Sequence, residues 1–194
     1  MAEQPRKQNA LFQSGTDQYA GLNACVGQNG GRYDLYDYAC GYFEATETLL
    51  KAAKHGKVTI DDIVYPVCLT FRHGVELFVK FLVTQLALLN DSEDKFEQKH
   101  SILANWKIVL KHKKSFSPQD ADFEKFNTVV NAIEEIDAYG MTFRYPDDRD
   151  GGQHLVEWPH INLHVLQLRH KEIADISKKW YSKMESLREA KATS

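Results

Sequence analysis

The chain has 194 residues, a length that is usual for one domain and sufficient to bury a sizeable core. Hydrophobic residues make up 43% and charged residues 26%, which excludes an intrinsically disordered or collagen-like protein. The formal net charge of -3 excludes a strong overall attraction to nucleic acid or acidic lipid, so such binding would need a local basic patch.

The cysteines and the hydropathy pattern bear on where the protein works. Cys25, Cys40 and Cys68 are odd in number, far apart and without a CxxC pair. This argues against a disulfide framework and against a zinc site, and it favours the reducing cytoplasm. Charged residues interrupt even the longest apolar segment, residues 63–89, so no membrane span is predicted.

The chain begins with a polar arm and continues with two predicted helices. Residues 1–31 are rich in Gln, Asn and Gly without a sustained hydrophobic period, so we interpret them as an arm that precedes one domain over 32–190. Apolar residues of 32–56 follow one helical face, and Gly56 supplies a stop. Residues 62–89 are apolar almost all round, which is typical of the central helix of a bundle.

Two more helices are predicted after the polar break at residues 90–94. The first shows helical apolar spacing over 96–110 and ends in the lysine-rich residues 111–114. Ser117 is the expected N-cap of the second, since a proline and an acid follow it, and that helix should end near Gly140.

The last part of the chain contains a loop and a long helix. Residues 141–159 hold prolines, glycines and acids that predict a structured loop or a short hairpin. Residues 160–190 repeat apolar side chains every seven residues, which favours packing against a partner helix. We therefore predict an all-α fold, an antiparallel bundle of about five helices around residues 62–89.

The most informative stretch is a charged ladder, Arg72, Glu76 and Lys80, inside the central predicted helix. The three side chains recur every four residues, so they share one helix face and can pair along it. Their surroundings are apolar, so we expect counter-charges from other segments. The ladder is either an internal ion-pair network that fixes helix register or part of a polar pocket. His73 points about 100 degrees away from Arg72 and need not join the same site.

Two further segments can contribute to such a pocket. His100 faces the ladder if its helix and the central helix are antiparallel neighbours, and otherwise it is a capping or packed histidine. The loop residues Arg144 and Asp147 lie among aromatic residues in the segment 143–147, and loops often carry function. A small-molecule pocket lined by Arg72, Glu76 and Arg144 is one possibility. In the other, Arg144 hydrogen-bonds helix ends while the aromatic rings plug the bundle.

Two groups carry weaker signals for metal or nucleic acid. His160 and His164 have the spacing of two metal ligands on one helix, but no third ligand is evident, so no metal site and no cofactor are predicted. A basic cluster can contact phosphates, although cations at a helix end also complement the helix dipole. The cluster consists of Lys107, Lys111, Lys113 and Lys114.

Short polar motifs within residues 33–187 resemble a known family. They are Tyr65-Pro66, Arg72-His73-x-x-Glu76-Leu77-x-x-Lys80, His100-x-x-Leu103 with Trp106, and Phe143-Arg144-Tyr145-Pro146-Asp147. The chain resembles the HEPN-like helical proteins of bacteria and their phages. This resemblance implies a bundle of four or five helices, often a homodimer, with roles in RNA cleavage, toxin and antitoxin pairs or phage defence. Many members of the family are catalytically inactive.

The resemblance also implies where an RNase site would lie. The family's ribonucleases use an Arg followed four to six residues later by a His, and in this chain only Arg149 and His154 have that order and spacing. His154 would take a proton from the ribose 2'-hydroxyl while Arg149 stabilises the phosphorane-like transition state. Two glycines between them predict a flexible loop, which positions such groups poorly. Arg72 with His100 is the alternative pair.

Two function classes follow from the sequence. The first is a HEPN-like nucleic-acid module that forms a dimer and is either a metal-independent ribonuclease or an inactive binder. Its partner would be RNA, a nucleotidyltransferase or an antitoxin. The second is a non-catalytic interaction protein in which the heptad face of the last helix binds a partner and the ladder is structural.

Overall fold

The computed structural model describes residues 9–15, 17–27 and 33–193, and the chain divides into two units, Met1–Tyr33 and Asp34–Ser194. Part of the predicted arm, residues 1–8, 16 and 28–31, lies outside the described residues. In the remainder of the first unit a 3-10 helix, η1, spans Asp17–Leu22. The hydrophobic side chains of Leu11, Phe12 and Leu22 there are exposed.

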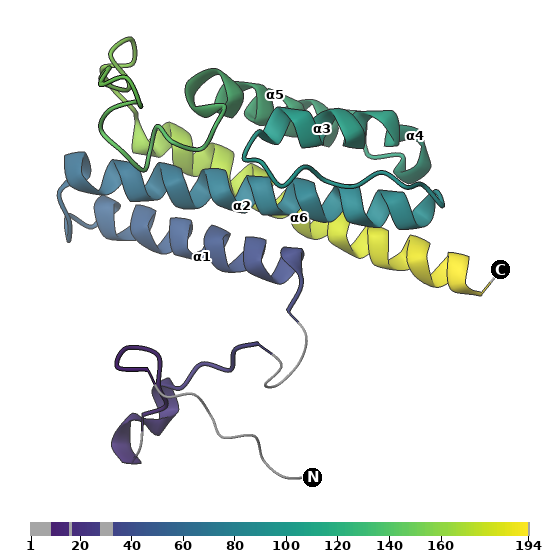
Figure 1. The fold of residues 1–194 in the computed structure, drawn as a ribbon, viewed down its shortest axis with the longest axis horizontal. Coiled ribbons are helices and arrows are strands. Elements are labelled where there is room, and N and C mark those ends of the chain that lie inside the picture. The colour runs from purple at the N-terminus through teal and green to yellow at the C-terminus, as the bar shows by residue number, and fades with distance from the viewer. Residues whose placement is uncertain (1–8, 16, 28–32, 194) are drawn as a thin grey trace. The chain divides into compact units, whose positions relative to one another are not determined.

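The second unit is a helical bundle (Figure 1). Its helices are α1 (Leu35–Lys54), α2 (Ile60–Leu89), α3 (Ile102–Lys111), the short α4 (Lys113–Phe116), α5 (Asp120–Asp137) and α6 (Leu163–Ala192). The described residues contain no strand, only one isolated bridge between Asp147 and Gln153. The prediction of an all-α bundle is confirmed. Within the described ranges no helix is both long enough and apolar enough to cross a membrane.

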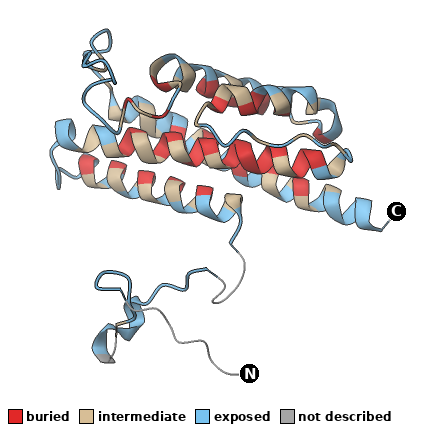
Figure 2. Ribbon diagram, viewed as in Figure 1, coloured by how far each residue is buried: buried red, intermediate tan, exposed pale blue. Residues whose placement is uncertain are grey.

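Helix α2 is the centre of the bundle, as its all-round hydrophobicity predicts. Sixteen of its 30 residues are buried, and it packs against α1, α3, α4 and α6. Figure 2 shows these buried positions along nearly the whole helix. Helix α5 packs instead on α3 and α6. Because α2 has no polar face to expose to solvent, it needs neighbours on every side, and other helices pack around it.

The helices around α2 do not all run antiparallel to it. The path of the chain between α2 and α3 determines where His100 lies. The chain turns tightly after α1, so α1 and α2 are antiparallel, but residues 90–101 run back along α2 as an irregular segment (Figure 1). Phe96 on this segment lies beside Lys80, and His100 lies beside Arg72. Helix α3 therefore runs in the same direction as α2. His100 reaches the ladder through the returning segment and not, as we expected, through an antiparallel helix pair.

Two predicted helix starts differ from the structure. Ser117 is the left-handed C-cap of α4, with φ of 40°, and the N-cap of α5 is Gln119. Pro118 disfavours helical geometry in the residue before it, so Ser117 ends one helix and does not begin the next. Helix α6 begins at Leu163, where the Asn162 side chain accepts hydrogen bonds from two backbone N–H groups.

The seven-residue apolar repeat of α6 faces the core of the same chain. Ile173, Trp180 and Met184 are almost completely buried. Trp180 stacks with Trp106 at a ring distance of 6.4 Å, and its ring is tilted against that of Phe126 at 5.1 Å. The partner that the repeat predicts is therefore this chain's own bundle, and the heptad face is not free for another protein.

Candidate functional site

The charged ladder is an internal ion-pair network in the structure. Arg72 Nη1 donates to Glu76 Oε2 at 2.6 Å, and Lys80 Nζ donates to Glu76 Oε1 at 2.8 Å. Arg72 and Glu76 are each only 1% exposed. The spacing of four residues on α2 produces both pairs, as the sequence predicts. Charges buried this deeply are destabilising unless they are paired, so this ion-pair network is a structural part of the core.

Two other segments supply the remaining partners of Arg72. Its Nε lies 2.9 Å from Asp137 Oδ2 at the end of α5, and its Nη2 donates to the backbone carbonyl of His100 at 2.6 Å. Asp137 Oδ1 accepts from the backbone N–H groups of Met141 and Thr142 at 2.7 and 3.0 Å. One guanidinium therefore joins α2, the returning segment and the start of the loop. Arg72 has no surface through which it can touch an external substrate.

Glu76 stays ionised although it is buried. Burial alone would raise the pKa of this carboxyl, but the contacts with His73, Lys80 and Arg72 outweigh that effect and hold the pKa well below its usual range. His73 Nδ1 is 3.7 Å from Glu76 Oε2, and the His73 ring packs edge-on against Tyr42 at 4.5 Å. His73 is therefore at the margin of the network, nearer to Glu76 than its position on the helix suggested.

Asp137 and Gly140 were not identified from the sequence as part of this network. Gly140 has φ of +73°, and a Cβ there would lie 3.1 Å from Arg72 Cζ, so the backbone passes directly over the guanidinium. Asp137 is the last residue of α5, where a negative charge opposes the helix dipole. An acid in that unfavourable position is the sequence signal that could have identified it.

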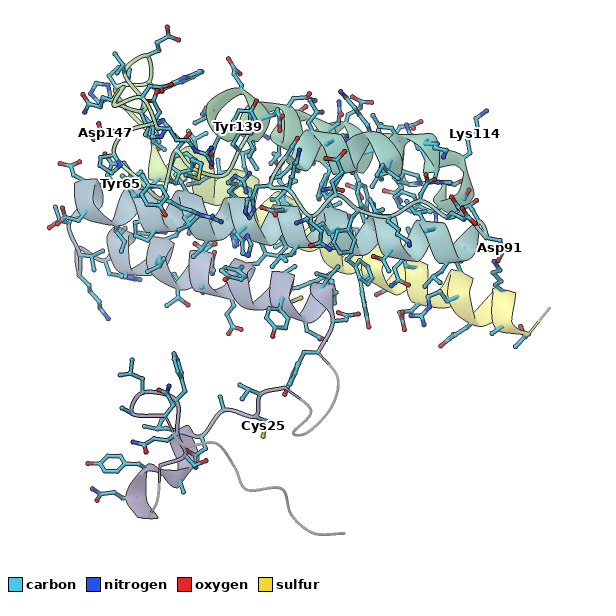
Figure 3. The ribbon with its side chains drawn as sticks, viewed as in Figure 1. Cys25, Tyr65, Asp91, Lys114, Tyr139 and Asp147 are labelled. Atoms are coloured by element: carbon cyan, nitrogen blue, oxygen red, sulfur yellow. The ribbon has the colours of Figure 1, made fainter. Side chains whose placement is uncertain are left out.

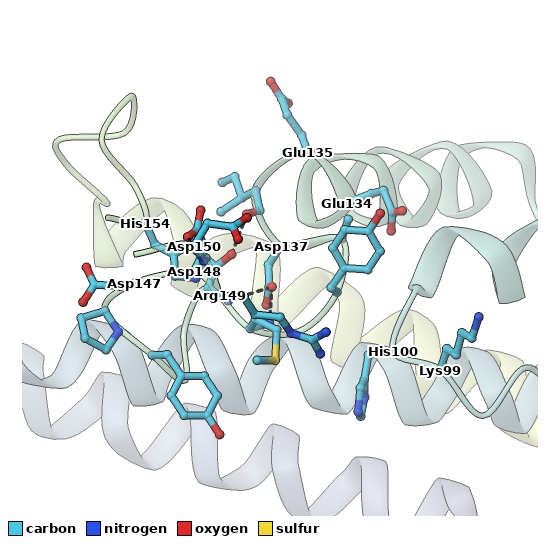
Figure 4. A pocket seen from close by; sticks show the side chains of 17 residues that line it. Lys99, His100, Glu134, Glu135, Asp137, Asp147, Asp148, Arg149, Asp150 and His154 are labelled. Atoms are coloured by element: carbon cyan, nitrogen blue, oxygen red, sulfur yellow. Dashed lines mark hydrogen bonds between the residues drawn. The ribbon is translucent and has the colours of Figure 1, made fainter. Parts of the chain in front are cut away.

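His100 connects the buried network with the surface. Its Nδ1 lies 3.2 Å from Glu76 Oε1, while its side chain is 43% exposed. It also lines the main cavity of the bundle, which has a volume of about 1030 Å³ (Figure 4). The end of α5 and the loop after it form the other walls. Six carboxylates lie around this cavity: Glu134, Glu135, Asp137, Asp147, Asp148 and Asp150.

Arg149 and His154, the predicted catalytic pair, both line this cavity. The two glycines between them predicted a flexible loop, but the backbone forms a hydrogen-bonded turn. Asp148 Oδ1 accepts from the N–H groups of Asp150 and Gly152 at 2.9 and 2.8 Å, and His154 N–H donates to the Pro146 carbonyl at 2.9 Å. These backbone N–H groups hold the pKa of Asp148 below its usual range.

His154 has an unusual ring nitrogen. Its Nε2 is buried, and no group in the described part of the chain hydrogen-bonds it. The cavity is therefore lined by the His154 ring, the Arg149 side chain and the partly exposed ring of His100, while the unpartnered His154 Nε2 itself is buried. The alternative pair of Arg72 and His100 is close in space but serves the core, since Arg72 is buried and fully engaged.

Arg144 does not take part in the cavity. Its side chain is exposed and makes no hydrogen bond or ion pair with any described residue, and it is absent from the cavity walls. A small-molecule pocket lined jointly by Arg72, Glu76 and Arg144 is thus not formed, because the first two are buried in the core. Asp147, from the same loop motif, does line the cavity.

The two histidines do not lie on one helix. His160 precedes α6 while His164 lies in its first turn, so the two are not on one helix face. Across the described ranges no group of three or more His, Cys, Asp and Glu residues is arranged to hold a metal ion. The helix begins after His160 because Asn162, and not a residue before His160, caps it.

The basic cluster lies at the opposite end of the bundle from the cavity, as the labels of Lys114 and Asp147 in Figure 3 show. Lys111 pairs with Asp94 at 2.8 Å. Lys113 lies 3.4 Å from Asp120 and 3.9 Å from the centre of the Phe123 ring. Lys107 and Lys114 are exposed and make no such contact with described residues.

Comparisons with protein-family models, with curated proteins and with solved structures find no match to this chain. The arrangement of the side chains themselves is therefore the basis for a functional proposal.

Proposed function

We propose that this protein is a non-catalytic interaction module that binds a protein partner with one end of its bundle. This recognition surface consists of residues 58–65 at the start of α2, the residues from the end of α5 to α6, and the first two turns of α6. In Figure 1 these elements lie together at the end opposite the C-terminus of α6. The start of α2 and the start of α6 are close in space, because Ile60, Leu163 and His164 all line a smaller cavity of about 370 Å³.

The distribution of exposed hydrophobic side chains carries the proposal. Nine of the twelve large hydrophobic residues that the second unit exposes belong to the recognition surface. They are Val58, Ile60, Tyr65, Tyr139, Tyr145, Val156, Trp158, Val165 and Leu168. Single exposed hydrophobic residues are ordinary, but their concentration at one end marks a binding surface. Tyr and Trp are also the residues that contribute most to protein interfaces.

A matched pair of variants tests the proposal. Trp158 on the recognition surface and Leu110 near the other end are both 41% exposed. The full chain, immobilised and incubated with an extract of its source cells, should retain a protein that Trp158→Glu loses and Leu110→Glu keeps. Light scattering of the purified protein tests whether the partner is a second copy of the same chain. In that case the unmodified chain forms a dimer, and Trp158→Glu should lower the measured molar mass toward that of a monomer. If both variants retain the same proteins and the same mass, the proposal is wrong.

A HEPN-like ribonuclease is the second candidate, and the shared cavity of Arg149, His154 and His100 favours it. The His154 ring would accept the proton of the 2'-hydroxyl, which requires that its buried Nε2 become accessible, and Arg149 would stabilise the charge on the phosphorane-like transition state. Toxin and antitoxin systems or phage defence would be its setting, and a second copy, a nucleotidyltransferase or an antitoxin its partner.

This candidate ranks second because the charges around the cavity would repel the phosphates of RNA. Six carboxylates face two cations, Lys99 and Arg149, around the cavity, and Asp137 alone among the six is neutralised by an ion pair with Arg72. Each uncompensated carboxylate at about 8 Å repels a phosphate charge by about 0.5 kcal/mol in water and by about 2 kcal/mol at a protein surface. Lys113 and Lys114, which would attract RNA, lie near the C-terminal end of α2, because Ser115 hydrogen-bonds Asn90 there. At about 1.5 Å per residue, that end is about 25 Å along α2 from Arg72.

The ribonuclease candidate has its own test. Labelled single-stranded RNA incubated with the chain and EDTA should be cleaved, and His154→Ala should abolish the cleavage. His164→Ala is the control, because His164 lies outside the main cavity. Cleavage that survives His154→Ala would come from a contaminant or another site, and absence of cleavage by the unmodified chain would leave the interaction module as the function.

A further inference from the structure

The recognition surface also includes an acidic stretch of the chain. Residues 134–157 contain seven carboxylates and two arginines, an excess of five negative charges. The whole chain has a formal net charge of only -3, so the remainder is net positive. The exposed hydrophobic side chains of this region are therefore surrounded by an excess of negative charge.

The carboxylates of the main cavity fall into two groups. Asp137 forms an ion pair with Arg72, and Asp148 accepts a hydrogen bond from the Gly152 N–H group within its own turn. Glu134 accepts hydrogen bonds from Ser101 Oγ and from the Leu103 N–H group. Those three have structural partners. Glu135, Asp147 and Asp150 are exposed, and their side chains make no hydrogen bond or ion pair with the described residues. Three carboxylates are therefore available to a ligand.

The aromatic walls add a second attraction for cations. Tyr139 and Tyr145 line the cavity and are 78% and 54% exposed. A tyrosine ring attracts a guanidinium or ammonium group over its face, and the attraction grows when the partner sheds water. A metal ion would not use this arrangement, because the carboxylates are too dispersed to form a coordination group. A volume of about 1030 Å³ suits an organic cation.

We propose that the recognition surface binds a basic segment of a partner protein, whose Arg or Lys side chain enters the acidic cavity while its apolar residues cover Val156, Trp158, Val165 and Leu168. The inference rests on the proposed function and names the chemistry of the partner. Charge complementarity selects this occupant, because a segment rich in Asp or Glu would be repelled by Glu135, Asp147 and Asp150. The exposed hydrophobic residues favour a protein segment over a free polyamine, which would leave them uncovered.

Selection from a random peptide library tests the partner's chemistry. Displayed 12-residue peptides are selected on the immobilised full chain, and enriched sequences are expected to combine Arg or Lys with Trp, Leu or Phe. A labelled peptide of the most enriched sequence is then titrated in fluorescence anisotropy. Its affinity should fall with added salt, since exposed charges are screened. Spermidine and L-arginine amide, tested as competitors, should displace it only at far higher concentration than the unlabelled peptide.

Charge-matched variants locate the site. The triple change Glu135→Gln, Asp147→Asn and Asp150→Asn should weaken peptide binding at least tenfold. The control triple change, Glu44→Gln, Glu124→Gln and Glu189→Gln, removes the same charge from exposed positions on α1, α5 and α6 and should leave the affinity within twofold. Thermal melts by circular dichroism check that both proteins fold.

The outcomes separate the inference from the proposed function. Enrichment of neutral or acidic peptides, equal binding by both triple variants, or displacement by spermidine as effective as by the peptide would overturn the inference. The proposed function would survive each of those results if partner capture still depended on Trp158. Loss of that dependence together with an unenriched library would overturn both.

Discussion

Replacing Glu76 with Gln tests whether the buried network is built as the structure shows. Arg72 would keep Asp137 and the His100 carbonyl, but Lys80, only 7% exposed, would lose its one carboxylate. Breaking a buried pair costs about 3 to 5 kcal/mol. Because Arg72 retains its other partners, we expect the lower end of this range, a loss of about 3 kcal/mol in the free energy of unfolding.

Urea unfolding followed by far-UV circular dichroism at neutral pH measures this loss. With a slope of about 2 to 3 kcal/mol per molar urea, the midpoint should fall by about 1 to 1.5 M. Glu185→Gln is the control, because it removes an exposed pair with Arg188 at 2.9 Å and should change stability by less than about 1 kcal/mol. Adding Lys80→Met to Glu76→Gln should recover part of the loss, since no unpaired ammonium would then be buried.

Equal midpoint shifts for Glu76→Gln and Glu185→Gln would refute the reasoning. That result would mean that water reaches Lys80 and Glu76 well enough to replace their pairing. The core would then not depend on the ladder.

Three further measurements probe the same bundle. Gly140→Ala should destabilise the protein by more than about 1 kcal/mol in urea unfolding, because of the positive φ and the contact with Arg72, whereas Gly41→Ala in α1, where a Cβ meets nothing, should stabilise it by about 0.5 to 1 kcal/mol. Since the folded-state pKa of Glu76 is depressed, its stabilisation is complete above the unfolded value of about 4.3 and is lost as the pH falls from there through the folded value. Urea midpoints measured between about pH 5 and pH 3 should therefore fall less steeply for Glu76→Gln than for the unmodified chain, and equal slopes would contradict the assignment. Burial lowers the pKa of His170, whose Nε2–H donates to the Phe43 carbonyl at 2.9 Å, so stability should decline as the pH falls below the unfolded value of about 6.5, and His170→Gln should flatten that decline in thermal melts.

Much of the fold was predictable because it depends on local periodicity. The all-round hydrophobicity of residues 62–89 identified the central helix, and the four-residue spacing of Arg72, Glu76 and Lys80 predicted their pairing. Helix boundaries were less certain where capping decides them. Ser117 and Asn162 both resemble N-caps in sequence, yet only Asn162 serves as one, because the backbone at Ser117 is left-handed.

By itself the sequence determined that the protein is a helical bundle and that buried charges on its central helix must have partners elsewhere. Only the tertiary structure decided which partners these are. Asp137 and His100 lie 65 and 28 residues from Arg72, and the returning segment that delivers His100 leaves no periodic signature. The same holds for the acidic cavity and the exposed hydrophobic end, because a site assembled from distant segments depends on how helices pack, and packing depends on contacts that local sequence patterns do not encode.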